Sequence, residues 1–249
     1  MTTPPRVLVI AGSDSSGGAG IQADIKTITM LGGYAMTAIT AITAQNTQGV
    51  DAVEVLSPAM VVAQIEACAR DIGVNAVKIG MLGSAEIAHA VADLLEGVNV
   101  PVVFDPVMVA TSGSALADPD TVAAFERLMA LATLTTPNVP ELAVLGGDEA
   151  MAARGIAYLA KGGDAEGDEL EDRLVIPGQD RLIWRGARIH TRHTHGTGCT
   201  LASAIATHLG AGKSLVEAVT AARAFVRAAL EAAPGFGEGH GPLGHQAVR

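Results

Sequence analysis

A single cysteine follows a glycine-rich turn in residues 193–209, HTHGTGCTLASAIATHL. Gly196, Thr197 and Gly198 precede an apolar-periodic run, so the sequence predicts a helix over 199–210 that begins at this turn. Backbone N–H groups at a helix start point outward and bind anions, and small residues let a phosphate approach the backbone closely. The turn is therefore a candidate phosphate site, with an ordinary glycine turn as the alternative.

Cys199 stands at the N-terminus of this predicted helix, where a thiol is expected to have a lowered pKa. The thiol could take a proton, act as a nucleophile with His193 or His195 as base, or bind a metal together with these histidines. No companion motif for acyl transfer is found, and the metal site lacks a recognisable fourth ligand. The sequence favours a proton acceptor beside a phosphate site.

These residues need a scaffold, and the hydrophobic pattern predicts one. Residues 7–11 read as a buried strand that leads through GSDSSGGAG into a helix, and further strands are predicted over 34–44, 76–81 and 101–108. Helices are predicted over 58–70 and 84–96. Strands that alternate with helices indicate an α/β fold with a mainly parallel sheet.

The second half of the chain continues this alternation. TTPNVPELAVLGG reads as a strand end, a turn and a short helix, and GIAYLAKGGD reads as a strand that runs into a loop. The acidic run at 165–173 is interpreted as a solvated loop, and LVIPGQDRLIWRGARIHTRH as two strands joined at PGQD. Helices over 199–210 and 214–232 close the fold, and we expect a flexible tail over 234–249.

Composition limits the classes of function. The chain has 249 residues, 49% of them hydrophobic and 3% aromatic, which suits one α/β domain over 1–249 with an aliphatic core. The net charge of -10 argues against a nucleic-acid partner. No export signal and no apolar run long enough to span a bilayer are found, so we expect a cytoplasmic protein without a membrane partner and with free thiols at Cys68 and Cys199.

Four stretches together carry a more specific resemblance: AGSDSSGGAGIQADIKT at 11–27, TAQNTQGV at 43–50, KIGMLGS at 78–84 and HTHGTGCTLASA at 193–204. The chain resembles the hydroxymethylpyrimidine and phosphomethylpyrimidine kinases of thiamine biosynthesis, and the likeness extends from residue 6 to about 232. The resemblance implies a ribokinase-like three-layer α/β/α sandwich. It also implies ATP as co-substrate, Mg²⁺, transfer to 4-amino-5-hydroxymethyl-2-methylpyrimidine and then to its monophosphate, and a homodimer.

The resemblance also implies where the pyrimidine binds. Its neighbours would be Gly12, Asp24, Gln45, Met81 and Val107. Gln45 offers a donor and an acceptor to an aminopyrimidine edge, Met81 and Val107 offer apolar contact, and Asp24 could accept a hydrogen bond from the substrate hydroxyl. By themselves, Gln45 reads as a polar residue at a strand end and Met81 as a core residue.

The phosphate side is implied in the same way. Asp105, Asn138, Glu141, Lys161 and Thr197 would bind ATP and its phosphates, with Asp105 and Glu141 holding Mg²⁺ through water. Asn138 is also a natural helix cap. The turn Gly196–Thr197–Gly198 and Lys161 would stabilise the transferring phosphoryl group. A thiol, Cys199, occupies the place where many ribokinase-like sugar kinases have an aspartate base.

One departure from the resemblance and several alternatives remain. Between Gly147 and Ile156 only a short DEAMAAR segment is found where the family has a longer helix. Residues 11–20 and 109–115 are rich enough in glycine and serine to fold over a substrate. Pyridoxal or pyridoxine is the alternative substrate, and the other classes considered are a non-catalytic pyrimidine or nucleotide sensor and a cysteine hydrolase.

Overall fold

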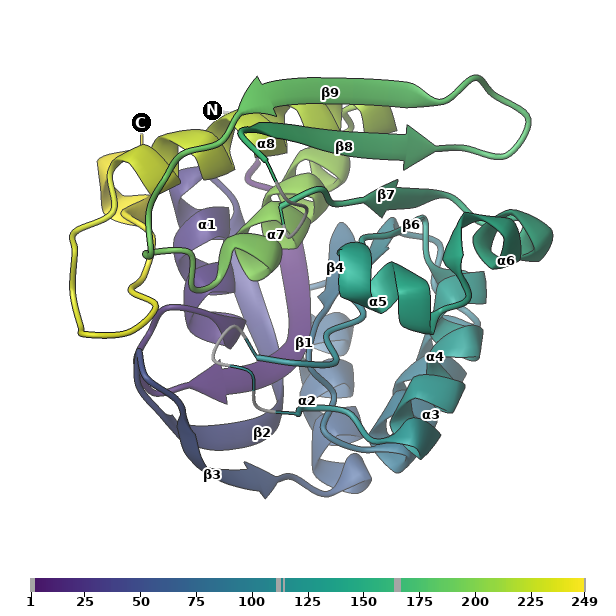
Figure 1. Ribbon diagram of the computed structural model, residues 1–249. Helices are drawn as coiled ribbons and strands as arrows, with labels where there is room; N and C mark the ends of the chain where they lie inside the picture. The colour runs from purple at the N-terminus through teal and green to yellow at the C-terminus, as the bar shows by residue number, and fades with distance from the viewer. Residues whose placement is uncertain (1–2, 111–112, 114, 164–166, 249) are drawn as a thin grey trace.

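The computed structural model describes residues 3–110, 113, 115–163 and 167–248. In this part of the chain nine strands form one sheet, in the order β3-β2-β1-β4-β5-β6-β7-β8-β9 (Figure 1). The strands are β1 Arg6–Asp14, β2 Tyr34–Gln45, β3 Val50–Val55, β4 Ala76–Ile79, β5 Val102–Phe104, β6 Leu134–Thr135, β7 Tyr158–Ala160, β8 Glu169–Val175 and β9 Leu182–Ala187. The helices are α1 Gly20–Met30, α2 Pro58–Asp71, α3 Ala85–Leu95, α4 Pro119–Leu131, α5 Val139–Val144, α6 Gly147–Arg154, α7 Thr197–Gly210 and α8 Leu215–Glu231.

The sheet is mostly parallel, as expected. Strand β1 pairs in parallel with β2 and with β4, and the parallel order continues through β5 and β6 to β7. Strand β3 is antiparallel to β2 at one edge, and β8 and β9 form an antiparallel extension at the other. The carboxyl ends of the parallel strands therefore meet along one edge of the sheet, where open α/β folds place their ligands.

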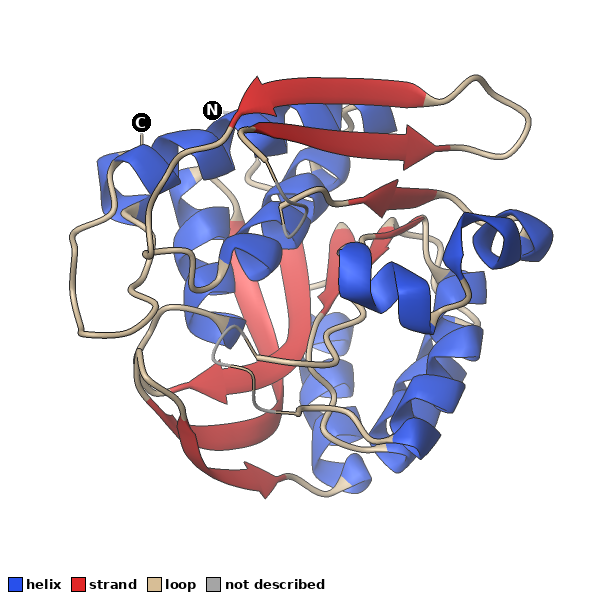
Figure 2. Ribbon diagram, in the orientation of Figure 1, coloured by secondary structure: helices blue, strands red, loops and turns tan. Residues whose placement is uncertain are grey.

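Helices cover both faces of the sheet, which confirms the three-layer α/β/α architecture (Figure 2). Because side chains alternate along a strand, Val7 and Val9 of β1 pack with α1, α7 and α8, whereas Leu8 and Ile10 pack with α2, α3 and α4. Both sets are almost completely buried. Such two-sided burial explains why β1 reads as an uninterrupted apolar run.

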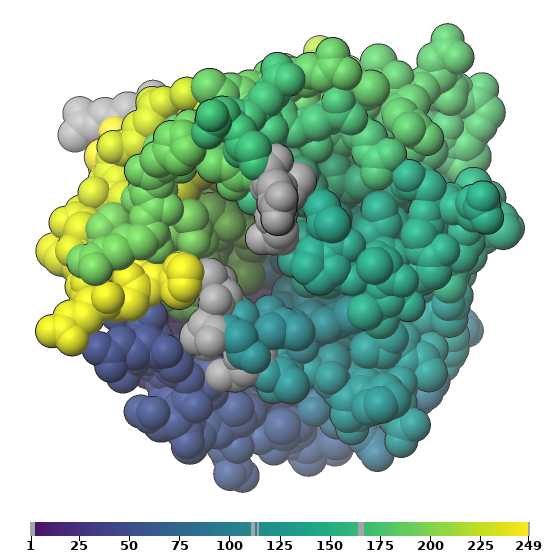
Figure 3. Space-filling model, in the orientation of Figure 1, coloured from purple at the N-terminus to yellow at the C-terminus, as the bar shows by residue number. Residues whose placement is uncertain are grey.

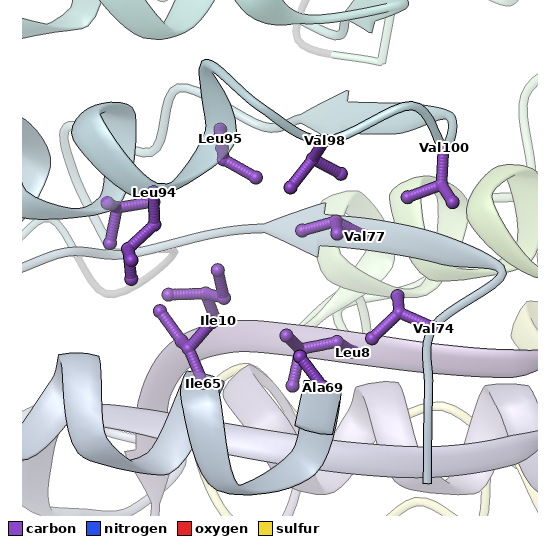
Figure 4. A pocket seen from close by; sticks show the side chains of 11 residues that line it. Leu8, Ile10, Ile65, Ala69, Val74, Val77, Leu94, Leu95, Val98 and Val100 are labelled. Carbon is purple, nitrogen blue, oxygen red and sulfur yellow. The ribbon is translucent and has the colours of Figure 1, made fainter. Parts of the chain in front are cut away.

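A small apolar cavity lies between the sheet and the α2 and α3 side of the molecule (Figure 4). Its volume is about 170 Å³. It is lined by aliphatic side chains alone: Leu8, Ile10, Ile65, Ala69, Val74, Val77, Val91, Leu94, Leu95, Val98 and Val100. With no polar group to orient a ligand, it is a packing defect of the core rather than a site for chemistry.

Two predictions about local structure are wrong. The acidic run was expected to be a loop, but Glu169–Val175 forms β8, which lies between β7 and β9, with Leu174 fully buried. Pairing with two neighbouring strands overrides the charge pattern there. The predicted strand over 101–108 is shortened to Val102–Phe104, since Pro101 and Pro106 flank it and lack a backbone N–H.

The expected flexible tail instead packs on the body of the protein. His195 N donates to the carbonyl of Gly241 at 3.1 Å, and a parallel bridge joins His195 to Pro242. Leu243 and His245 are only 3% and 1% exposed. Glycines there allow close approach, because a Cβ at Gly239 or Gly241 would overlap neighbouring residues. The C-terminal segment therefore packs against the body of the protein through Leu243 and His245.

Among the described residues, no helix is both long enough and apolar enough to cross a membrane. Cys68 and Cys199 are free thiols, as expected.

Candidate active site

A large cleft of about 1080 Å³ opens along the carboxyl edge of the parallel strands. Figure 3 looks onto the molecule from this side, where segments from all parts of the chain surround a hollow. Every parallel strand contributes to it: Ala11 to Asp14 from β1, Thr43 and Gln45 from β2, Lys78 and Met81 at β4, Asp105 after β5, Asn138 after β6 and Lys161 after β7. The turn before α7 supplies Gly196 to Cys199.

One region of the cleft combines apolar surface with an amide. Gly12, Gln45, Met81 and Val107 all line it, as four of the five predicted pyrimidine contacts. A Cβ at Gly12 would lie 3.0 Å from the Met81 sulfur, so a larger residue there would require the Met81 side chain to shift. The Gln45 amide lies at the end of β2, 3.1 Å from the Thr43 hydroxyl. The arrangement fits a small, flat, polar-edged ring.

Asp24, the fifth predicted pyrimidine contact, does not line the cleft. It is fully buried on α1, where its oxygens accept from Lys78 Nζ at 3.0 and 2.9 Å and from the Ser203 hydroxyl at 2.6 Å. Both carboxylate oxygens therefore accept from internal donors, and a hydrogen bond from the substrate hydroxyl to Asp24 stays a prediction. Burial raises the pKa of Asp24, although the Lys78 charge opposes the shift.

A second region of the cleft carries charge. Lys161 Nζ donates to Asp105 Oδ1 at 2.7 Å and lies 3.9 Å from Glu141 Oε2. Burial by itself would lower the pKa of Lys161, but the Asp105 and Glu141 carboxylates raise it above its ordinary value, so the side chain stays charged. Asp105 also accepts from the Thr136 hydroxyl at 2.9 Å. A cation aimed into the cleft is suited to bind phosphate.

Asn138 and Glu141 form a capping box at α5. The Asn138 side-chain oxygen accepts from the backbone N–H of Glu141 at 2.8 Å, and the Glu141 carboxylate accepts from the backbone N–H of Asn138 at 2.8 Å. The structural role considered for Asn138 is thus present, and both side chains also line the cleft. The box holds them in place beside Lys161.

The predicted anion turn lies where α7 starts. Gly196 adopts the left-handed conformation (φ 87°) and caps the helix, which begins at Thr197, two residues earlier than expected. A Cβ at Gly198 would stand 3.3 Å from Lys161 Nζ and 3.4 Å from Asp105 Oδ2. The helix N-terminus and the Lys161 ammonium group therefore approach the same part of the cleft, where a phosphoryl group would meet both.

The prediction of a lowered pKa at Cys199 is wrong. Burial raises the pKa of the thiol to about 11, and the nearby charge of Lys78 does not offset it. The acidic side chains of Asp24 and Asp105 add to the increase. Burial disfavours the thiolate, so the thiol is expected to be protonated at neutral pH.

Among the cleft residues that were not predicted as site residues of the kinase, three are charged or titratable and buried: Lys78, Asp14 and His195. His195 was considered only as a base or metal ligand beside Cys199. In the structure its Nε2 lies 2.8 Å from Asp14 Oδ2. Burial would raise the pKa of Asp14, but hydrogen bonds from His195, Ser16 and Ala19 hold it below its ordinary value. For Lys78, the sequence did offer a signal, which is a charged residue within an apolar strand pattern.

The donor set suits magnesium rather than zinc. Within the described residues, no three His, Cys, Asp or Glu side chains are arranged to hold a metal, which removes support for a His193, His195 and Cys199 site. Mg²⁺ needs fewer protein ligands, because it keeps several waters and binds through one or two carboxylates and substrate phosphates. Asp105 and Glu141, which both line the cleft beside Lys161, fit that requirement.

The two loops predicted to cover a substrate differ in what the structure shows. The segment 11–20 is tied down by hydrogen bonds to Asp14 from the amides of Ser16, Gly18 and Ala19. In the second loop, Val109 and Ala110 line the cleft, whereas residues 111, 112 and 114 lie outside the described residues. Asp164, which follows Lys161 and two glycines, also lies outside them. That these two loops cover a bound substrate stays a prediction.

The segment after Gly147, expected to be shorter than in the family, forms the eight-residue helix α6, Gly147–Arg154.

The family model and the curated relatives that match this chain describe the same kind of kinase. The model of the phosphomethylpyrimidine kinase family matches residues 14–244. The hydroxymethylpyrimidine/phosphomethylpyrimidine kinase of Rhizobium meliloti (strain 1021) is 49% identical, with 96% of each chain covered. The protein of the same name from Streptomyces coelicolor is 46% identical, with 98% of this chain and 95% of the relative covered.

Solved structures share the fold. The pyridoxal kinase of Bacillus subtilis, solved with ADP, superposes with a TM-score of 0.90 at 33% identity over 99% of both chains. The phosphomethylpyrimidine kinase of Clostridium difficile 630 superposes with a TM-score of 0.78 at 39% identity, over 90% of this chain and 98% of that one. With its strand-edge cleft, its anion turn and a family match over nearly its whole length, this chain belongs to the phosphomethylpyrimidine kinase family.

Proposed function

We propose that this kinase transfers phosphoryl groups from ATP to 4-amino-5-hydroxymethyl-2-methylpyrimidine and then to its monophosphate, in thiamine biosynthesis. One observation carries the proposal. Gln45, Met81 and Val107, which we propose bind the ring, line the same cleft as Lys161 and the turn before α7. A heterocycle bound by the first set would present its hydroxymethyl group to a phosphoryl held by the second.

Phosphoryl transfer depends mainly on positioning and on stabilising negative charge. The amides of residues 197–199 at the start of α7 and the Lys161 ammonium group supply fixed positive charge toward the same place. Asp105 and Glu141 would hold Mg²⁺ through water, and the bound ion would neutralise charge on the ATP phosphates. The capping box and the Asp105–Lys161 pair already hold these side chains beside the start of α7.

Cys199 has a limited role in proton transfer. With a thiol pKa of about 11, it is not a preformed base at neutral pH. A protonated thiol cannot accept a proton, so Cys199 would act as the base only as its thiolate, a minor form near neutral pH, which would take the hydroxyl proton late, as the phosphoryl arrives. A positioned base typically adds about 10²- to 10⁴-fold to a rate, so most of the acceleration would come from charge and alignment.

The nucleotide base would lie beyond the phosphates, toward β9 and α8. This part of the cleft is lined by Gly186, Ala187, Val226 and Leu230 and by four arginines, Arg185, Arg188, Arg223 and Arg227. Arg223 is held by Asp172 at 2.6 Å and lies over the Trp184 ring. The apolar side chains could contact the faces of a purine, and the arginines could bind phosphate oxygens.

Pyridoxal is the second candidate substrate, and one observation favours it. The pyridoxal kinase of Bacillus subtilis superposes with a higher TM-score than the pyrimidine kinase of Clostridium difficile 630. The identities run in the opposite order, 33% and 39%. Both substrates are flat nitrogen heterocycles with a hydroxymethyl group, so Gln45 could bond either one.

The deciding experiment is mass spectrometry of reactions that contain the purified protein, ATP, Mg²⁺ and one candidate substrate at a time. Successive gains of one and two phosphates on the pyrimidine would support both steps. Phosphorylation of pyridoxal alone would transfer the assignment to that substrate. Binding of the pyrimidine without any product would identify a sensor instead.

Two controls sharpen this experiment. Lys161→Met should abolish turnover while the pyrimidine still binds, because Lys161 lies in the phosphate region. Omission of Mg²⁺ should stop turnover, and added Mg²⁺ should restore it.

A homodimer is also proposed from the family resemblance. Sedimentation equilibrium would report twice the chain mass if the dimer forms.

A further inference from the structure

Asp14 and His195, 181 positions apart in the chain, form a buried pair beside the cleft. We propose that they act as one positioning unit, which joins the loop after β1 to the turn before α7 and so aligns the substrate hydroxymethyl group with the transferring phosphoryl. The alignment part of this proposal rests on the proposed function. The joining of the two segments does not.

The pair is tightly made. His195 Nε2 lies 2.8 Å from Asp14 Oδ2, and the two side chains are only 6% and 4% exposed. A carboxylate oxygen only accepts hydrogen bonds, so Nε2 carries the hydrogen and donates it to Asp14. A hydrogen bond to an ionised group is among the stronger kinds, and removal of one partner leaves the other buried without it.

Asp14 organises the loop that follows it. Its carboxylate accepts from the backbone N–H groups of Ser16, Gly18 and Ala19 at 2.8, 3.1 and 2.8 Å. It also accepts from the Ser16 hydroxyl at 2.9 Å. The loop therefore wraps around one side chain just before α1 begins at Gly20. A displacement of Asp14 would displace the whole loop.

His195 is held from its other side and pressed against the same loop. Its backbone N–H donates to the Gly241 carbonyl at 3.1 Å, which anchors it to the C-terminal segment. A Cβ at Gly18 would collide with the His195 ring, and a Cβ at Gly196 would collide with the Gly18 carbonyl. The two segments thus touch backbone to backbone, and glycine at both positions makes this possible.

The unit lies between the two functional regions. On the ring side, the loop residue Ser15 exchanges two hydrogen bonds of 2.8 Å with the backbone of Gln45, and the Gln45 amide lies 3.4 Å from His195 Nε2. On the phosphate side, Gly196 to Gly198 follow His195 directly. A shift in the pair would change the distance from the ring to the phosphoryl, and a 1 Å misplacement can cost about 10²-fold in rate.

The kinetic test compares two replacements of His195. His195→Gln keeps an N–H that can reach Asp14, and His195→Leu keeps bulk without a donor. We expect the kcat of His195→Leu and of Asp14→Asn to fall about 10²-fold, with the KM for the pyrimidine changed less than about threefold. His195→Gln should recover most of the loss. The double variant Asp14→Asn/His195→Leu should lose no more than either single variant, because the two residues act together.

Hydrogen–deuterium exchange supplies a measurement that does not require a substrate. Asp14→Asn should speed amide exchange in residues 193–198 as well as in 14–19, and His195→Leu should do the same in both segments. The matched control is the exposed pair His190–Asp168, 3.2 Å apart. His190→Gln and Asp168→Asn should alter neither exchange nor kcat.

Three results would overturn the proposal. One is a loss confined to KM, another is a double variant whose losses multiply, and the third is exchange that changes only in the mutated segment. If His195→Leu or Asp14→Asn fails to fold, His195→Gln still tests the role of the hydrogen-bond donor. Wild-type exchange and kcat in His195→Gln would show that a donor to Asp14 is sufficient at this position. If the wild type phosphorylates neither heterocycle, the proposed function fails, and the exchange result still tests whether the pair joins the segments.

Discussion

The Asp24 and Lys78 side chains are both fully buried, and each is the other's counter-charge. Lys78 stays charged because, although burial lowers its pKa, the charges of Asp24 and Asp105 raise the pKa above its ordinary value. Removal of one partner from such a pair leaves an uncompensated charge in the interior. We therefore expect a substitution of Asp24 to lower the stability of the fold more than it weakens substrate binding.

Asp24→Ala should lower the free energy of unfolding by about 3–5 kcal/mol. Urea denaturation followed by circular dichroism measures this loss. The double variant Asp24→Leu/Lys78→Met, which removes both charges and keeps bulk, should recover most of the stability. A stable Asp24→Ala protein with a large increase in the KM for the pyrimidine would instead restore Asp24 as a substrate ligand.

Cys199 should react with iodoacetamide slowly near neutral pH, with a rate that rises toward a midpoint of about 11. The physical reason is that burial disfavours the thiolate, which is the reactive form. The rate is measured by mass spectrometry on a Cys68→Ala background, so that only one thiol can be labelled. A midpoint below the ordinary thiol value would show that the helix N-terminus prevails after all.

At the scale of elements, the start of α7 is where phosphoryl charge would gather. Gly198→Asp would add a carboxylate close to Asp105, since the Cβ position at Gly198 is 3.4 Å from Asp105 Oδ2. We expect Cys199→Ala to leave a slow but measurable kinase, down by at most about 10²- to 10⁴-fold, and Gly198→Asp to be slower still. Gly198→Ala, which adds a methyl group without charge, is the matched control. Equal and total losses in Cys199→Ala and Gly198→Asp would refute this order.

The C-terminal segment provides a prediction about pH. Burial and the charge of Lys26 lower the pKa of His245 to about 4, so the folded state resists protonation more than the unfolded state. The stability from neutral His245 is therefore complete above the ordinary pKa of 6.5 and is lost as the pH falls from there toward 4. The shift corresponds to about 3 kcal/mol.

Urea unfolding of the wild type and of His245→Gln across this pH range tests the prediction. His245→Gln keeps a group able to bond the Thr200 hydroxyl, which lies 2.8 Å from His245 Nε2. Groups common to both proteins cancel in the difference. Parallel losses in the two proteins would mean that His245 does not contribute.

At the scale of the whole molecule, the cleft is built from residues between Ala11 and His240. Ligands that bind there contact segments from both ends of the chain, so they should stabilise the fold as one unit. At about 100 times its Kd, a ligand adds about 2.7 kcal/mol, equivalent to a Tm increase of roughly 5–10 °C for a chain of this size.

Differential scanning calorimetry with ATP and Mg²⁺, with the pyrimidine, and with both measures these increases. Lys161→Met should lose the increase caused by ATP and keep the one caused by the pyrimidine. Loss of both increases in this variant would show that the two regions of the cleft are not separable.

Much of the architecture was predictable because it depends on neighbours in the chain. The apolar run of β1, the strand-helix alternation and the glycine turn before α7 each report local preferences. The resemblance identified Gln45, Met81, Val107 and Lys161, which meet in the cleft because parallel strands end at one edge of the sheet. The strand β8 was missed, since its acidic pattern is that of a loop until β7 and β9 pair with it.

The sequence alone determined the family, the order of elements and most of the cleft. Only the tertiary structure decided that Asp24 pairs with Lys78, that His195 bonds Asp14, that the thiol of Cys199 stays protonated and that the C-terminal segment packs on the core. The physical reason is range. Propensity and periodicity act over a few neighbouring residues, whereas burial and electrostatic pairing depend on atoms that the fold brings together from 54 or 181 positions away.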